Sequence, residues 1–127
     1  MKIAISSTGK DIDSAIDPRF GRAAYFIIAE IKNKEFKIVK TIANPNINVG
    51  GGAGVSAGQL VANEQVSAVI TGNIGPRAMD VFSQLKIEVY SAAGTVKKAI
   101  EDFMKNKLQK ITMPGPMGIG KPSRGRI

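Results

Sequence analysis

The sequence contains no cysteine, no histidine and no tryptophan. Without thiolate or imidazole side chains, the protein cannot form a zinc finger or a cysteine-ligated iron–sulfur centre. The same absences exclude cysteine nucleophiles, Ser-His-Asp triads and imidazole general bases. Any metal held by this chain would need oxygen, thioether or backbone ligands, or ligands that the metal brings with it.

Long hydrophobic runs are also missing. The apolar run from Ala23 to Ala29 is among the longest, and it is far shorter than the roughly 20 residues that span a bilayer. The chain begins with a basic and then apolar stretch, but polar residues from Ser6 to Lys10 follow too soon for a secretory signal. We therefore expect a cytoplasmic protein that does not insert into a membrane.

Charge is unevenly distributed along the 127 residues, whose formal net charge is +8. Residues 105–127 contain six basic and no acidic side chains, whereas residues 1–104 are nearly neutral. After residue 107 glycine and proline are frequent and apolar anchors are few, which is typical of a flexible segment. We predict one folded domain over 1–107 and a flexible basic tail over 108–127. Nucleic-acid or acidic-protein binding through this tail is the alternative function.

Hydrophobic patterning predicts the order strand, hairpin, helix, strand, helix, strand, helix. Strands are expected at residues 2–6, 23–31, 36–43, 67–71 and 87–91, and helices at 55–65, from Pro76 and from Val96. Pro76 suits a first helical position and Thr95 suits an N-cap. This order predicts a mixed α/β sheet with an antiparallel hairpin edge and helices on both faces, three layers in all.

A crevice is expected where the chain connections leave two neighbouring parallel strands in opposite directions. If the strand at 67–71 pairs with the first strand, this crevice opens between their carboxyl ends. Its rim would then consist of Ser6, Ser7 and Thr8 on one side and Thr71, Gly72 and Asn73 on the other.

The loop from Asp11 to Arg22 is rich in charged residues. Its carboxylates, Asp13 among them, could bind a hard cation, and Arg19 and Arg22 could bind an anion through paired N–H groups. The alternative is a solvated loop with local ion pairs, in which Phe20 packs against the edge of the sheet.

Two glycine-containing segments precede helices. The run from Gly50 to Gly54, with Gly51 and Gly52, offers free backbone N–H groups at a helix N-terminus, an arrangement that favours anions. It does not follow the first strand, as the dinucleotide-binding fingerprint requires, and a plain connector is the alternative. The segment Gly72-Asn73-Ile74-Gly75-Pro76 lies at the proposed crevice, and its alternative is a tight turn.

Several short stretches together resemble the dinitrogenase iron-molybdenum cofactor biosynthesis family, the small domain shared by the nitrogenase accessory proteins NifX and NafY and by the C-terminal part of NifB. In the family's order, the matching stretches are residues 1–5, Asp13-Ser14, residues 20–26, Asn44-Pro45, residues 52–54, residues 72–78, Val89-Tyr90 and residues 94–96. The resemblance covers residues 1–107. It implies a ribonuclease H-like fold with the sheet order 3-2-1-4-5.

The resemblance also implies a non-catalytic protein that carries or transfers an anionic iron–molybdenum or iron–sulfur cluster, with a cofactor-assembly protein as partner. Arg19 stands where many relatives have histidine, as does the segment Val49-Gly50-Gly51, so ligation by histidine or cysteine is impossible here. Electrostatic capture by arginines and loop amides remains. The candidate site residues are Ser6, Ser7, Asp13, Arg19, Arg22, Gly51, Gly52, Gly54, Gly72 and Asn73.

A nuclease is the third possibility, suggested only by the name of the fold. It would need carboxylates on the strands to hold two metal ions. Asp11, Asp13 and Asp17 are instead expected on a loop.

Overall fold

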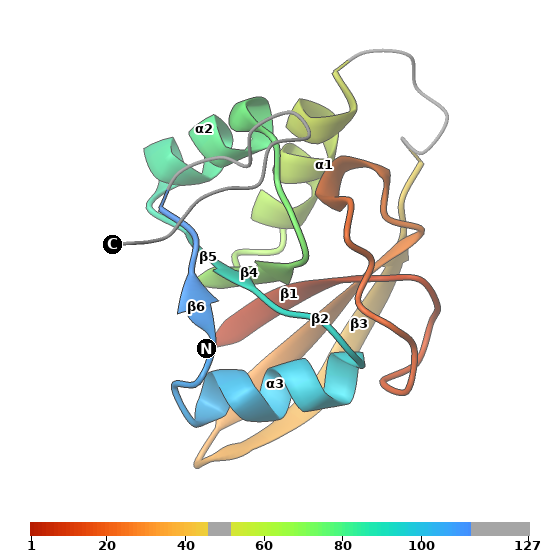
Figure 1. Cartoon of the computed structure of the whole chain (residues 1–127), viewed down its shortest axis with the longest axis vertical. Coiled ribbons are helices and arrows are strands. Elements are labelled where there is room, and N and C mark those ends of the chain that lie inside the picture. Colours follow the sequence, from red (N-terminus) through yellow and green to blue (C-terminus); the bar gives the residue numbers. More distant parts are fainter. Residues whose placement is uncertain (46–51, 113–127) are drawn as a thin grey trace.

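The computed structural model describes residues 1–45 and 52–112, which form an α/β fold with one mixed sheet (Figure 1). The elements are β1 (Lys2–Ser7), a 3₁₀ turn η1 (Phe20–Arg22), β2 (Tyr25–Lys32), β3 (Glu35–Ala43), α1 (Ala53–Ala62), β4 (Ala68–Thr71), α2 (Pro76–Leu85), β5 (Glu88–Ser91), α3 (Val96–Met104) and β6 (Gln109–Lys110). Within these residues, no helix is long and apolar enough to cross a membrane.

The six strands lie in the order β3-β2-β1-β4-β5-β6. β1, β4 and β5 are parallel, with Ala4 opposite Val69 and Val69 opposite Val89. β2 and β3 form the antiparallel hairpin on one side of β1. The predicted order 3-2-1-4-5 is therefore confirmed, and β6 adds an antiparallel strand beyond β5.

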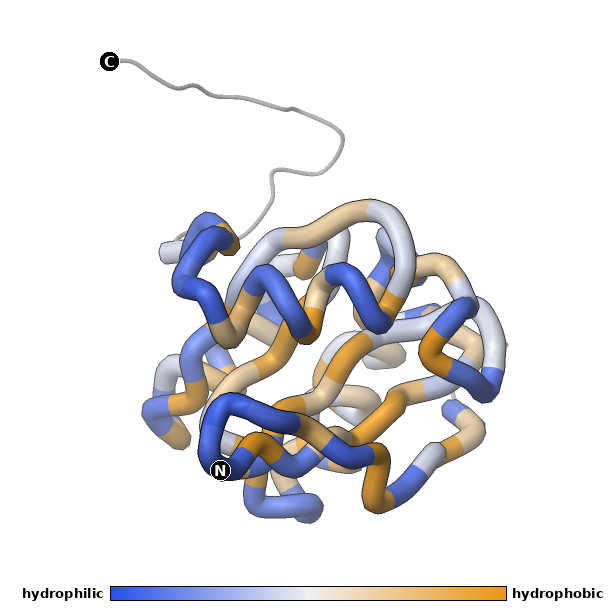
Figure 2. Tube along the Cα trace, turned by 90° about the horizontal axis from the view of Figure 1, so that it is seen from below, coloured by the Kyte–Doolittle hydropathy of each residue, from blue (hydrophilic) through white to orange (hydrophobic). Residues whose placement is uncertain are grey.

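Two hydrophobic cores lie on opposite faces of the sheet. One core joins the sheet to α1 and α2 and contains Phe26 and Phe82, whereas the other joins it to α3 and contains Ile5 and Ile100. Figure 1 shows α1 and α2 on one side of the strands and α3 on the other. In Figure 2 the hydrophobic stretches lie mainly in the central strands and the hydrophilic ones in the outer segments. The predicted three layers are thus present.

The helices begin close to the predicted positions. Pro76 is the first residue of α2, where its missing N–H costs no hydrogen bond. The Thr95 hydroxyl caps α3 by accepting a hydrogen bond of 3.2 Å from the N–H of Lys98. α1 starts at Ala53, two residues earlier than predicted, because Gly52 adopts the left-handed conformation with φ +76° and ends the preceding loop.

β6 extends the folded domain past the predicted boundary at residue 107. Gln109 pairs with Ser91, Lys110 pairs with Tyr90, and the N–H of Ile111 donates a 2.7 Å hydrogen bond to the carbonyl of Val89. Two residues are too few to show an alternating pattern, so the sequence did not reveal this strand. The remainder of the predicted tail, residues 113–127, lies outside the described residues.

The attachment of β6 is expected to weaken in acid. Hydrogen bonds from the Tyr90 hydroxyl and the Lys110 ammonium to Glu88, 2.7 and 3.0 Å long, lower the pKa of Glu88 below its usual 4.5. Such a carboxyl stabilises the fold above its unfolded pKa, and this contribution is lost as the pH falls through the folded pKa. We therefore expect Glu88→Gln to lower the free energy of unfolding slightly at about pH 7 and to match the wild type at about pH 2.

Urea unfolding of both proteins at the two pH values measures this difference. Glu35→Gln is the matched control, because Glu35 is exposed and makes no ion pair with a described residue. An equal loss for Glu88→Gln and Glu35→Gln at neutral pH would contradict the prediction.

Candidate functional site

The loop that follows β1 crosses the carboxyl ends of the parallel strands. Its backbone is fixed there by the N–H of Asp17, which donates to the carbonyl of Ser6 at 3.0 Å, and by the N–H of Phe20, which donates to the carbonyl of Asn73 at 3.2 Å. The Ser6 hydroxyl lies 2.8 Å from the carbonyl oxygen of Asp17 and 2.8 Å from the Thr71 hydroxyl. The crossing loop is therefore held to both central strands.

This crossing closes the crevice predicted between β1 and β4. A Cβ added at Gly72 would lie only 2.7 Å from the Cα of Pro18, so the loop rests directly on the backbone that follows β4. Ser6 and Ser7 are fully buried beneath it, and the Ser7 hydroxyl donates to the carbonyl of Gly9 at 2.7 Å. These two serines support the loop instead of forming an open rim, which corrects the expectation from the sequence.

The loop is anchored in both hydrophobic cores. Phe20 is 2% exposed and packs against Phe26 and Phe82 at ring-centroid distances of 5.1 and 5.3 Å. Ile16, four residues earlier, belongs to the core on the α3 face. Pro18 lies between these two anchors and remains exposed. Buried anchors on both sides thus hold the exposed part of the loop in place.

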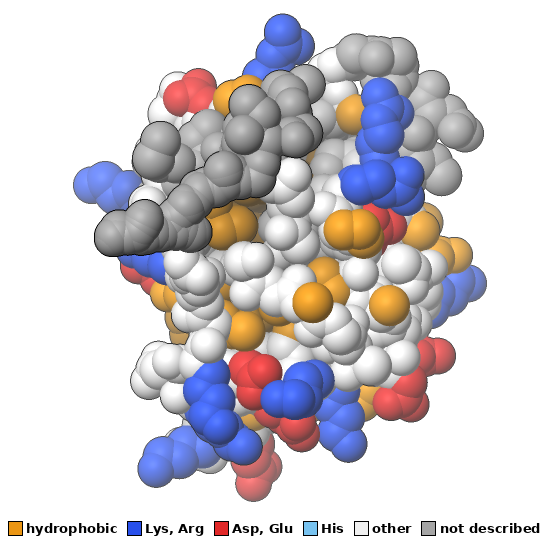
Figure 3. All heavy atoms as spheres, in the orientation of Figure 1, with side chains coloured by type: hydrophobic (Ala, Val, Ile, Leu, Met, Phe, Trp, Pro, Cys, Tyr) orange, Lys and Arg blue, Asp and Glu red, His pale blue; other side chains and the backbone are white. Residues whose placement is uncertain are grey.

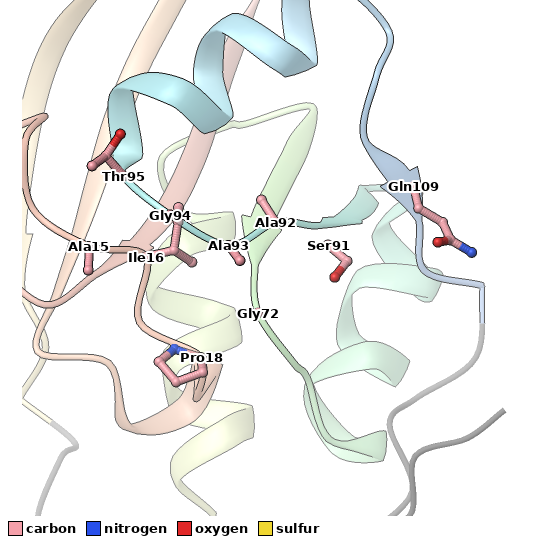
Figure 4. Close-up of a pocket in the computed structure, with 10 residues that line it drawn as sticks. All are labelled: Ala15, Ile16, Pro18, Gly72, Ser91, Ala92, Ala93, Gly94, Thr95 and Gln109. Atoms are coloured by element: carbon pink, nitrogen blue, oxygen red, sulfur yellow. The ribbon is translucent and has the colours of Figure 1, made fainter. Parts of the chain in front are cut away.

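An open groove of about 810 Å³ lies beside this loop, at the carboxyl ends of β4 and β5. In Figure 4 Gly94 and Thr95, at the end of the segment between β5 and α3, lie beside the loop residues Ala15 and Ile16, with which their backbone is paired. Ser91 and Gln109 lie on the other side of Gly72. The lining residues are Ala15, Ile16, Pro18, Gly72, Ser91, Ala92, Ala93, Gly94, Thr95 and Gln109. The opening is therefore displaced from the predicted position by about one strand, toward β5.

Backbone groups provide much of the polar chemistry of the groove, because none of its lining side chains is charged. The N–H groups of Ala93, Gly94 and Thr95 donate no hydrogen bond to any described residue, and all three residues are exposed. They directly precede the N-terminus of α3, where the helix dipole favours negative charge. Figure 3 shows uncharged surface over the middle of this face and charged side chains gathered over α3. The groove can therefore donate hydrogen bonds to an anion or to sulfur.

Arg19 carries a positive charge and directly follows the groove-lining Pro18 in the chain, although it does not itself line the groove. Its side chain is 67% exposed, and its Nε lies 3.4 Å from the Oδ1 of Asp17, which also accepts a 3.0 Å hydrogen bond from the Arg19 N–H. The carboxylate of Asp17 is 3% exposed, so this pairing compensates a buried charge. The two terminal nitrogens of Arg19 have no partner among the described residues and can reach a ligand.

The glycine segment before α1 lies on the other side of the loop. A Cβ added at Gly21 would lie 3.0 Å from both the N and the Cα of Gly54, so η1 and the first turn of α1 are in close backbone contact. Arg22 ends η1 and is half-buried. The structure therefore brings Arg22 and Gly54 together, next to the N-cap Gly52, whereas Gly51 lies outside the described residues.

The other candidate residues are placed as follows. Asn73 is exposed, and its carbonyl accepts the hydrogen bond from the N–H of Phe20. It therefore helps to attach the crossing loop to the segment after β4. Asp13 is exposed near the start of that loop, and its N–H donates to the carboxylate of Asp11 at 3.1 Å. Among the residues that the structure describes, no group of three or more acidic side chains could hold a metal ion. Asp13 is not among the residues that line the groove.

The sequence missed the segment from Ala92 to Thr95 as a site. Its alanines have no side-chain chemistry to identify them, and Gly94 is predicted as a break before α3 and as part of a family-matching stretch, not as a site residue. The available signal was a run of small residues between a strand and a capped helix, the position at which α/β folds bind ligands.

Comparison with known proteins places the chain in a family. The family model described as dinitrogenase iron-molybdenum cofactor matches residues 1–106. The chain belongs to the dinitrogenase iron-molybdenum cofactor family. An uncharacterized protein of Methanocaldococcus jannaschii is 39% identical over 112 residues, which cover 87% of this chain and 95% of that protein.

Solved structures of similar proteins share the fold. The apo form of the orange protein from Desulfovibrio gigas has a TM-score of 0.81 and 27% identity, and the match covers 91% of this chain and 96% of that one. A Thermotoga protein described as a candidate NifB protein has a TM-score of 0.70 and 31% identity, over 92% and 98% of the two chains. The family resemblance and the fold expected from the sequence are both confirmed.

Proposed function

We propose that this member of the dinitrogenase iron-molybdenum cofactor family binds an anionic metal–sulfur cluster in the groove beside the crossing loop and delivers it without chemical change. In this proposal the protein works in the cytoplasm and acts as a carrier, not as an enzyme. Family membership supports an accessory role in handling the cofactor. The observation that carries the proposal is the groove itself, with three N–H groups at the N-terminus of α3 that donate to no other described residue.

The size and lining of the groove suit such a cargo. Its volume of about 810 Å³ is within the range of about 300 to 1,000 Å³ that is usual for small-molecule sites. Alanine, isoleucine and proline side chains suit the polarisable sulfide surface of a cluster, and backbone N–H groups donate hydrogen bonds to cluster sulfurs. Since the chain has no cysteine and no histidine, the cluster would keep the ligands it brings with it. Such binding is reversible by nature, as delivery to a partner requires.

Arg19→Ala is expected to weaken cluster binding about three- to tenfold, because one exposed charge-assisted hydrogen bond is lost from the rim. The measurement is an anaerobic titration with a synthetic tetranuclear iron–sulfur cluster that carries thiolate ligands, followed by visible absorption. Lys32→Ala is the matched control. It removes the same charge from the end of β2. That end of β2 lies beside the amino end of β1, so it is at the opposite end of the sheet from the groove.

The outcomes separate the site from general charge attraction. Equal weakening by Arg19→Ala and Lys32→Ala would show that only net charge matters. Absence of saturable binding above that of lysozyme, a basic protein of similar size, would contradict the proposed function.

A further inference from the structure

The outer edge of β3 forms one margin of the sheet (Figure 1). Within the described residues, the backbone of residues 35–43 is paired only with β2, and no other described element bonds to it. β3 is nine residues long, whereas β6 at the opposite margin has two. A long row of unpaired N–H and C=O groups is a template for a further strand.

A β-bulge decides which way the side chains of β3 point. Successive residues of β2 pair with Ile38 and Lys40, so Val39 is an extra residue on β3. Lys37 and Lys40 are three positions apart and would point to opposite faces of a regular strand. Because of the bulge, their partners on β2 are two residues apart, and one of these, Ile28, belongs to the core under α1 and α2. Both lysines therefore lie on the face that α1 and α2 cover.

The opposite face of β3 is apolar. Phe36 and Ile38 stand opposite Ile31 and Ala29, which belong to the core on the α3 face. Ile38 is 37% exposed and its neighbour Val39 is 43% exposed, so this part of the edge leaves apolar surface uncovered. A strand added here would meet lysines with one set of alternate side chains and apolar groups with the other.

Charge selects between the possible occupants of this edge. Lys34 and Lys37 make no ion pair with a described residue, and Lys40 pairs with Glu64 at 3.0 Å but keeps a side chain that is 56% exposed. Glu35 is the single acidic residue of β3. A second copy of the chain would bring these lysines against their own counterparts, and like charges on neighbouring strands repel. An acidic strand is attracted by the same lysines.

We propose that the outer edge of β3 binds an extended segment of a partner protein in which acidic and apolar residues alternate, and adds it to the sheet as a further strand. Main-chain hydrogen bonds supply affinity in this mode of recognition, and the alternating side chains supply specificity. β2 and β1 separate β3 from β4 and β5, whose carboxyl ends form the groove. A partner docked on β3 therefore leaves the groove open, and the inference does not depend on what the groove binds.

A peptide of alternating glutamate and valine, long enough to span β3, is the probe for the isotope-labelled full-length chain. We expect saturable shifts in the amide NMR signals of residues 37–40, without shifts at Ala93 and Gly94. Lys37→Glu should weaken binding about three- to tenfold, because an exposed attraction becomes a repulsion. Lys97→Glu makes the same charge change at an exposed position of α3, and it should alter binding by less than about twofold because distant surface charges are screened.

The other outcomes overturn the proposal. Equal binding of a lysine–valine peptide would exclude selection by charge, and equal binding of a peptide with its glutamates and valines in two separate blocks would exclude an alternating strand. Shifts at residues 37–40 that appear when the protein is concentrated without peptide would identify a second copy as the occupant. Absence of saturable shifts at these residues would show that the edge takes no such strand. Since no cluster is present, this proposal and the proposed function fail separately.

Discussion

Phe20→Ala is expected to lower the free energy of unfolding by about 3 to 5 kcal/mol, the usual cost of removing a buried phenylalanine. Phe20 is 2% exposed and contacts two other aromatic rings, Phe26 and Phe82, so its removal leaves a cavity between η1, the sheet and α2. Domains of this size are stable by only about 5 to 15 kcal/mol in total. Urea unfolding followed by circular dichroism measures the change.

Two further variants keep this prediction testable if Phe20→Ala does not fold. Phe20→Leu retains most of the buried volume and should cost about 1 to 2 kcal/mol. Leu85→Ala also truncates an apolar side chain, but one that is 55% exposed, and it should change stability by less than about 0.5 kcal/mol. Equal losses for Phe20→Ala and Leu85→Ala would show that the loop is not anchored in the core.

Gly72→Ala is the second substitution with a large expected effect. The new methyl group would lie 2.7 Å from the Cα of Pro18, and backbone at that distance must move. We expect a loss of about 1 to 3 kcal/mol in the free energy of unfolding, typical of overpacking. We also expect shifts in the amide NMR signals of Ile16 to Arg19, because the crossing loop is displaced from β4.

Gly75→Ala is the matched control in the same connection. A Cβ added at Gly75 has no neighbour within 4 Å, and its φ of −81° suits alanine. The cost there should be less than about 1 kcal/mol, without shifts in the crossing loop. If Gly72→Ala leaves the signals of Ile16 to Arg19 unchanged, Pro18 does not rest on this backbone in solution.

Local rules predicted much of the fold. Pro76 and Thr95 marked the starts of two helices through effects that act within one turn, and β-branched runs marked the five longer strands. β6 escaped notice because two residues carry no pattern, and its position depends on pairing with β5. Sequence therefore identified the elements whose stability is largely local.

The site was harder to predict, since it depends on where a long loop crosses the sheet. Ser6 and Ser7 have the polarity of rim residues, yet the loop buries them through contacts with residues far along the chain, such as Thr71. In one of the two interpretations of the loop, Phe20 packs against the edge of the sheet; in the structure it lies instead in the core on one face, against Phe26 of β2 and Phe82 of α2. Ala92 and Ala93 contribute to the groove through their small size and, for Ala93, through its backbone N–H, neither of which side-chain chemistry reports.

The double anchoring of the crossing loop affects how a ligand would associate. Ile16 lies in one core and Phe20 in the other, so the segment between them loses its conformational freedom when the domain folds. A ligand that binds against this segment needs to order little of its backbone. Association should therefore approach rigid-body docking, with a small entropic penalty. Association without an ordering step in this part of the site would then follow from the way one loop is inserted on both faces of the sheet.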